Sequence, residues 1–241
     1  MESIGMPTGD GLISTPVTPE TYVPTDDDIY IEAGSGKQRI MFGAPLEYSE
    51  EEMEKVEEFN EFMEKNALTV PKQYNFREKF RFLQGAGFDN KKAYDGITAH
   101  CEFTEKYFPA SPEGLEDLLN SGAFYFYKKD KHFRPVCIIN CKKLVQTEMD
   151  DEQCLKMTLA LVSHIIDVAM VSGRVENWFV IADCKDMGVT EVPKNKLQKM
   201  ISTMQNMFRG RLYRLYGVNV PFFFRAIWTL AKQMCDKYTQ K

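Results

Sequence analysis

Long hydrophobic runs, paired cysteines and clustered histidines are what this sequence of 241 residues lacks. No apolar stretch approaches the ~20 residues of a membrane-spanning helix. The acidic N-terminus lacks the basic and apolar segments of a secretory signal and the character of a mitochondrial transit peptide, and Glu2 excludes N-myristoylation. These absences favour a cytoplasmic protein, with a membrane surface or a large assembly as the place where it acts.

The residues of common metal and catalytic sites are also missing. The six cysteines include no CxxC pair, and His100, His132 and His164 do not stand at zinc-site spacing from them. We therefore expect free thiols in a reducing compartment and no metal. Gly85 and Gly87 follow an expected helix rather than a strand, which favours helix termination over a nucleotide-binding loop. No nucleophile and base occur at a useful spacing, so we expect no enzyme, no catalytic residue and no cofactor.

The sequence has fewer basic than acidic residues, which gives a formal net charge of −5 and an isoelectric point near 5.4. This balance argues against a nucleic-acid partner, whose binding surface needs a basic excess. Apolar material is abundant: 44% of the residues are hydrophobic and 12% are aromatic. The chain can therefore build a substantial core.

Residues 1–48 have the composition of a disordered segment. They combine five prolines with glycines, threonines and the run Asp26-Asp27-Asp28. We do not expect such a composition to bury enough apolar surface to order itself. The prediction is an acidic extended tail that is ordered only where a protein partner holds it.

Three amphipathic helices are expected in the next region, residues 49–108. Ser49 and Glu52 form a capping box for the first, which ends near Lys65. Its apolar stripe consists of Met53, Val56, Phe59 and Met63. The second helix spans residues 76–84, and the third begins at Asp89 or Asn90 and continues to about residue 105.

From residue 109 to 241 the pattern changes to alternating strands and helices. Residues 123–127 and 135–140 predict an antiparallel hairpin, and residues 178–182 predict a strand buried on both sides. Helices are expected at 150–170 and 194–208, and a further strand at 212–218. This order predicts an α/β domain behind a helical cap.

The last residues predict a helix that is apolar on most sides. Pro221 ends the preceding strand and can open a helix, and Phe222 to Met234 then carry three phenylalanines and Trp228. A helix of this kind has to cover something apolar. It covers either a thick core or an oily ligand.

Three arginines, Arg209, Arg211 and Arg214, alternate with other residues just before this helix. They form either a solvated turn or a contact for a phosphate or anionic headgroup, since a guanidinium matches phosphate oxygens in bidentate geometry.

Several short motifs resemble those of the CRAL-TRIO family, and they occur in the family's order from about Glu50 to Lys241. Residues 80–97, FRFLQGAGFDNKKAYDGI, resemble the N-terminal helical signature. Residues 134–136, RPV, are similar to the G-R-P-V of the second hairpin strand, with Phe133 in place of the glycine. Residues 179–183 and Gly188 resemble the buried strand that ends in Asp and its loop. Residues 216–228, YGVNVPFFFRAIW, resemble the segment that leads into the mobile gate helix.

The resemblance implies a helical N-terminal bracket followed by a mixed sheet with flanking helices and a gate helix. It also implies a hydrophobic ligand such as a phospholipid, a phosphoinositide, a tocopherol or a retinoid. The family's phosphoinositide-binding Pro-Glu-Arg element reads Arg209-Gly210-Arg211 here, so its Glu is absent while its Arg matches Arg211. A headgroup Thr matches Thr239. The sequence stops before the family's last strand.

The expected function is binding, with transfer as an extension, of a phospholipid or similar molecule in an apolar pocket closed by the Phe222–Met234 helix. The alternative is a non-enzymatic structural subunit that uses the same fold as a protein-interaction scaffold. The headgroup would contact Arg211 and Thr239. The expected pocket residues are Phe124, Phe126, Val136, Ile138, Phe179, Ile181, Leu215, Phe223, Ile227, Trp228 and Met234.

Overall fold

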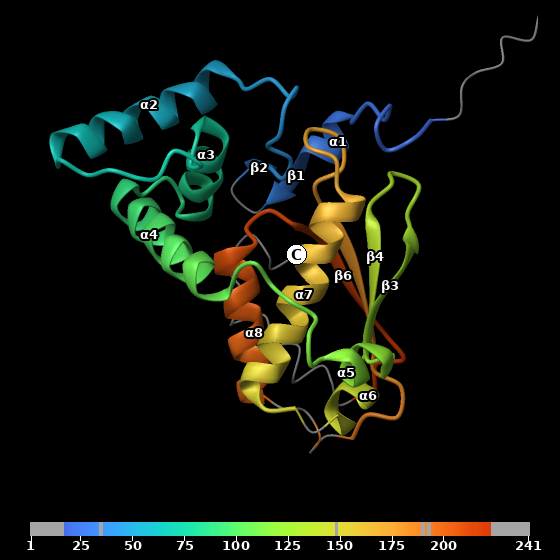
Figure 1. Cartoon of the computed structure of the whole chain (residues 1–241). Helices are drawn as coiled ribbons and strands as arrows, with labels where there is room; N and C mark the ends of the chain where they lie inside the picture. Colours follow the sequence, from blue (N-terminus) through green and yellow to red (C-terminus); the bar gives the residue numbers. More distant parts are fainter. Residues whose placement is uncertain (1–16, 34–35, 148, 189–190, 192–193, 223–241) are drawn as a thin grey trace, which may run out of the picture.

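The structure, a computed structural model, describes residues 17–33, 36–147, 149–188, 191 and 194–222. A layer of helices lies beside a four-stranded sheet, and two long helices lie on one face of that sheet (Figure 1). Each of these two parts has its own cluster of buried apolar side chains. The architecture is mixed α/β, as the sequence predicts.

The helical layer consists of α2 (Glu50–Lys65), α3 (Phe76–Gly85) and α4 (Asn90–Tyr107). The predicted capping box between Ser49 and Glu52 is present, and the side chains of Asn75 and Asp89 cap α3 and α4. Such caps each stabilise a helix by about 1 kcal/mol. Of the predicted stripe of α2, Val56, Phe59 and Met63 are buried. Met53 is 47% exposed, so its inward orientation was wrongly predicted.

The four-stranded sheet has the order β3-β4-β5-β6, with β3 (Phe124–Lys129), β4 (Pro135–Asn140), β5 (Trp178–Asp183) and β6 (Leu212–Val218). The β3–β4 pair is the predicted antiparallel hairpin, whereas β4, β5 and β6 are parallel. Parallel neighbours need a crossover, and α7 (Asp151–Ala169) and α8 (Lys194–Met207) supply the two. Because both crossovers step in the same direction, right-handed connections place both helices on one face of the sheet.

Two short helices were not predicted: α5 (Glu116–Asn120) precedes β3 and α6 (Cys141–Gln146) follows β4. Helices of five and six residues are too short to show a 3.6-residue period, so no sequence window could separate them from loops.

The N-terminal segment, residues 17–33 and 36–48, is folded onto the rest of its own chain. It contains α1 (Asp26–Ile29), β1 (Tyr30–Ala33) and β2 (Gly36–Arg39), and the two strands form an antiparallel pair. Ile40, Met41 and Phe42 are almost completely buried. The prediction of an extended tail that needs a protein partner for order is therefore wrong for these residues; residues 1–16 lie outside the described part of the chain.

Hydrogen bonds between polar side chains and backbone groups hold this segment between the two cores. The carboxylate of Glu176 accepts from the amides of Phe42 (2.7 Å) and Gly43 (2.5 Å). The Asn177 side chain donates to the carbonyls of Ile40 (2.9 Å) and Gly210 (2.5 Å). A Cβ at Gly43 would collide with Ser172 and Glu176, so the chain can pass this close only with glycine.

Two buried ion pairs complete the attachment. Arg39 makes a two-point contact with Glu52 of α2, with both N–O distances at 2.8 Å, and its guanidinium lies over the rings of Tyr30 and Tyr48. Asp28 of α1 accepts from Arg134, the residue just before β4, at 2.5 Å. The composition of the segment is polar, but its arginine and aspartate find partners in other elements, which a composition argument cannot foresee.

Candidate functional site

Among the described residues, helices cover one face of the sheet and leave the other face open. Phe124, Cys137, Trp178 and Val180 point toward α7 and belong to the core cluster of the sheet, where Met157, Val162 and Ile165 of α7 pack against them. The alternate residues of β4 and β5 point the other way, because successive side chains of a strand lie on opposite faces. The candidate site is this second face, called here the open face.

Four of the predicted ligand-binding residues meet on the open face. Val136 pairs with Phe179, and Ile138 pairs with Ile181, in the parallel register of β4 and β5. All four side chains are partly exposed, and none belongs to either core cluster of the described residues. The prediction that β5 is buried on both sides thus holds only for its α7 side within the described part of the chain.

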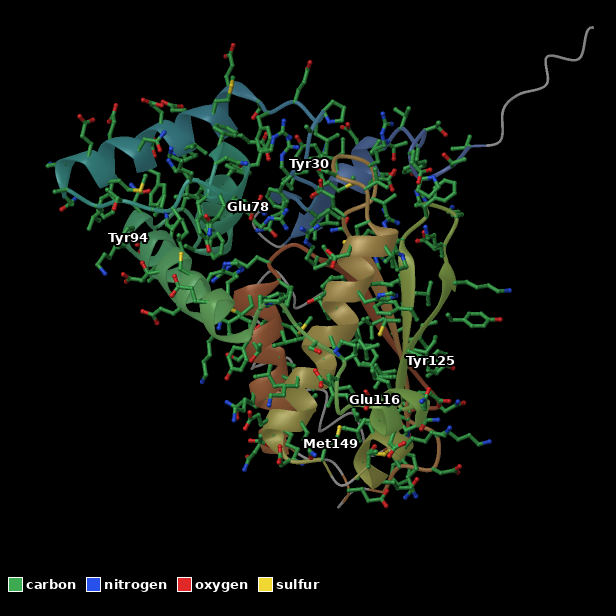
Figure 2. The ribbon with its side chains drawn as sticks, viewed as in Figure 1. Tyr30, Glu78, Tyr94, Glu116, Tyr125 and Met149 are labelled. Atoms are coloured by element: carbon green, nitrogen blue, oxygen red, sulfur yellow. The ribbon has the colours of Figure 1, made fainter. Side chains whose placement is uncertain are left out.

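Tyrosines of the two outer strands border these four residues. Tyr125 of β3 pairs with Ile138 and is 40% exposed (Figure 2). Tyr216 of β6 pairs with Ile181, and its ring centroid lies 5.0 Å from that of Phe179. The open face is therefore an aliphatic and aromatic strip with phenol hydroxyls at both margins, a combination suited to a molecule with an apolar body and polar ends.

Phe124, Phe126 and Leu215 lie elsewhere. Phe124 and Phe126 contribute to the cluster under α7, and Leu215 pairs with Val180, which points to the same side. The structure does not bring these three together with the four residues of the open face. For Phe124 and Phe126 the physical reason is that β3 carries aromatic residues at consecutive positions, so its apolar pattern does not distinguish its two faces.

The predicted gate helix begins at the edge of the described chain. Phe222 is 90% exposed. The rest of the predicted Phe222–Met234 helix, with Phe223, Ile227, Trp228 and Met234, falls on residues outside the described part of the chain, and so does Thr239. Their roles remain predictions.

The arginine cluster is divided between different environments. Arg211 is packed between the two cores, where it donates to the carbonyl oxygen of Glu176 (3.2 Å) and contacts the sulfur of Met170. Burial, together with the nearby charge of Arg81, lowers the pKa of Arg211 to about 10. Arg214 is exposed on β6 and pairs with Phe179 in the strand register, so it borders the open face.

Hydrogen bonding to Tyr216, followed by the interaction with Tyr213, raises the pKa of Arg214. A fixed cation thus stands beside the apolar strip at the β6 margin. Sequence reasoning named Arg211 for the headgroup role and did not separate it from Arg214. The strand register, which places Arg214 opposite Phe179, is the signal that distinguishes them.

The thiols of the described chain are structural in character. Burial raises the pKa of Cys137, and it raises the pKa of Cys141 to about 12 with a further contribution from Cys184, whose sulfur lies 3.9 Å away. Protonated thiols are poor nucleophiles. Within the residues that the structure describes, there is no cluster of three or more metal-ligating side chains, and no helix is long and apolar enough to cross a bilayer.

Known proteins resemble the chain in sequence and in fold. The model of the CRAL/TRIO domain matches residues 119–241, which is half of the chain. The "Sec14 cytosolic factor" of Schizosaccharomyces pombe is 23% identical over 185 residues; the match covers 67% of this chain and 63% of the relative, so it spans less than two thirds of that protein's length. A solved structure described as "Crystal structure of Sfh5" superposes with a TM-score of 0.62 and 14% identity, covering 81% of this chain and 80% of the other.

The family match includes all four strands of the mixed sheet and the two crossover helices, and the structural likeness covers a larger share of the chain than the family match does. The chain belongs to the CRAL/TRIO domain family.

Proposed function

We propose that the protein binds a lipid on the open face of its sheet and is not an enzyme. The observation that carries the proposal is the division of the sheet into a face packed under α7 and a face whose apolar side chains stay outside both cores of the described residues. Apolar surface that no described residue covers is available to a ligand. Each CH₂ group of the ligand that moves onto it from water contributes about 0.8 kcal/mol to the free energy of binding. Family membership supports lipid as the ligand.

A phospholipid fits the margins of the site. Its tails would lie along Val136, Ile138, Phe179 and Ile181, and its phosphate would interact with Arg214 and the hydroxyl of Tyr216. Arg211 and Thr239 are the headgroup residues that the family resemblance indicates. The Phe222–Met234 helix would close the pocket, and its opening would permit transfer between membranes from a cytoplasmic location.

The test compares the uptake of a tail-labelled fluorescent phospholipid from vesicles by the protein and two variants. Ile138→Gln and Ile181→Gln each place a polar amide on the open face, and each should weaken lipid binding on the order of tenfold, because about 1.5–3 kcal/mol of apolar burial is lost. Val168→Gln is the matched control, since Val168 is 62% exposed on α7 and lies away from the open face. Equal uptake by all four proteins would contradict the proposal.

The scaffold alternative predicts no retained lipid and a face that is covered by another protein. One argument for it was the need for a partner to order the N-terminal segment. Residues 17–33 and 36–48 make their contacts within their own chain, so the described segment supplies no such argument. The lipid assay separates the two functions directly.

A further inference from the structure

The end of β3 and the turn that follows it carry three lysines close together in the sequence. Lys128, Lys129 and Lys131 are exposed, and no carboxylate of the described residues lies within ion-pair distance of their amines. Many exposed lysines elsewhere are paired with a carboxylate, as is the case for Lys37, Lys55, Lys91, Lys92, Lys156 and Lys199.

The acidic residue within the turn does not neutralise these amines. One oxygen of Asp130 accepts from the amides of His132 and Arg134, both at 2.8 Å, and the other lies 3.4 Å from the Arg134 guanidinium. Its charge is thus committed to the base of the turn. The carboxylate of Glu20 interacts electrostatically with Lys129 without forming an ion pair with it. The three lysines thus still make a local excess of positive charge on a protein whose formal net charge is −5.

Exposed tyrosines lie beside these lysines. Tyr127 is 64% exposed and has the Lys128 amine 5.1 Å from its ring centroid, and Tyr125 lies two residues before it on the same outer strand. Such side chains combine an apolar ring with a polar end, which suits the interface between water and a bilayer. Tyr125, Tyr127, Lys128, Lys129 and Lys131 are called here the basic turn surface.

The basic turn surface has a fixed place relative to the open face. Tyr125 pairs with Ile138, so the same strand borders both, and β3 lies on the side of the sheet away from the helical layer (Figure 1). A lipid that enters or leaves the open face past β3 therefore passes these lysines.

We propose that the basic turn surface docks the protein on an anionic bilayer, so that the open face is presented to lipid. The proposal rests on the proposed function for its direction, since it names the source from which that site is filled. The chemistry is electrostatic attraction between three unpaired ammonium groups and anionic headgroups, aided by insertion of tyrosine rings at headgroup depth. An acidic protein as the occupant is the competing outcome.

The test is flotation of the full chain with phosphatidylcholine vesicles that contain or lack phosphatidylserine. The protein should float with the anionic vesicles, and added salt should release it. K128A/K129A/K131A should reduce the partition coefficient on the order of 100-fold, since each lysine near an anionic surface adds about 1 kcal/mol. The control K91A/K92A/K156A makes the same change of charge on α4 and α7 and should bind as the unmodified protein does.

Equal flotation of the two triple variants, binding that ignores phosphatidylserine, or no flotation at all would each overturn the proposal. Lipid extracted from the purified proteins separates this result from the proposed function. If lipid is retained while flotation does not depend on the turn lysines, only the docking inference fails. If flotation depends on the lysines while no lipid is retained, the lipid-binding proposal fails instead.

Discussion

At the residue scale, buried charge determines how the N-terminal segment is attached. Asp28 is almost completely buried and accepts from Arg134, from the Tyr22 hydroxyl (2.6 Å) and from the Thr25 amide and hydroxyl (both 2.9 Å). Burial alone would raise the pKa of this carboxyl, but the hydrogen bonds and the Arg134 charge hold it below the ordinary value. Removing one partner of such a pair leaves the other charge buried and uncompensated.

We predict that Asp28→Asn lowers the free energy of unfolding by about 3 kcal/mol at neutral pH. The pKa of Asp28 is lower in the folded state than the value of 3.8 for the free side chain. The charge of Asp28 therefore stabilises the fold fully above pH 3.8, and this stabilisation is lost as the pH falls through the lower folded-state pKa. The difference between the two proteins in urea titrations should therefore shrink on acidification. A difference that stays constant with pH would contradict this account; Asp27→Asn, at an exposed neighbouring position, is the control.

At the element scale, β3 shows why a sequence can predict a strand without predicting its faces. The run Phe124-Tyr125-Phe126-Tyr127 is aromatic at every position. Its composition therefore indicates a strand, but without alternation of apolar and polar residues it does not indicate which face is buried. Only the register with β4 sorts Phe124 toward α7 and Tyr125 toward the open face. The same register separates Arg214 from Arg211, which the sequence presents as one cluster.

We predict effects of very different size on stability at these two neighbouring positions. Phe124→Ala should lower the free energy of unfolding by about 3–5 kcal/mol, since it opens a cavity under α7. Tyr125→Ala should cost less than about 1 kcal/mol, because its ring is 40% exposed. Thermal or urea unfolding measures both, and a larger loss at Tyr125 than at Phe124 would contradict the assignment of faces.

The Ile40–Phe42 segment gives a second prediction at this scale. Phe42 is 1% exposed, and its ring lies 6.3 Å from that of Phe80 and 4.3 Å from the Arg81 guanidinium. Phe42→Ala should lower the free energy of unfolding by about 3–5 kcal/mol, whereas Val23→Ala, at a residue 75% exposed, should change it by less than about 0.5 kcal/mol. If Phe42→Ala were neutral, the segment would not belong to the core.

At the scale of the whole molecule, the sequence predicts the helical layer and the order of strands because those elements are long and carry local signals. The capping box at Ser49 and the alternation of strands and helices after residue 109 are signals of this kind. The attachment of residues 17–48 could not be predicted, since Glu176 and Asn177 are more than 130 positions from the amides of Phe42 and Gly43 and the carbonyl of Ile40. The choice of open-face residues likewise depends on non-local register.

In the part of the chain that the structure describes, α7 and α8 cover one face of the mixed sheet and the other face is apolar, and the central claim is that this second face holds lipid. Native mass spectrometry of the purified protein, combined with lipid extraction of the same sample, tests it most directly. The account predicts close to one lipid molecule per chain, with less lipid retained by Ile138→Gln and Ile181→Gln. A protein that carries no lipid, and takes up none from vesicles, would contradict the claim.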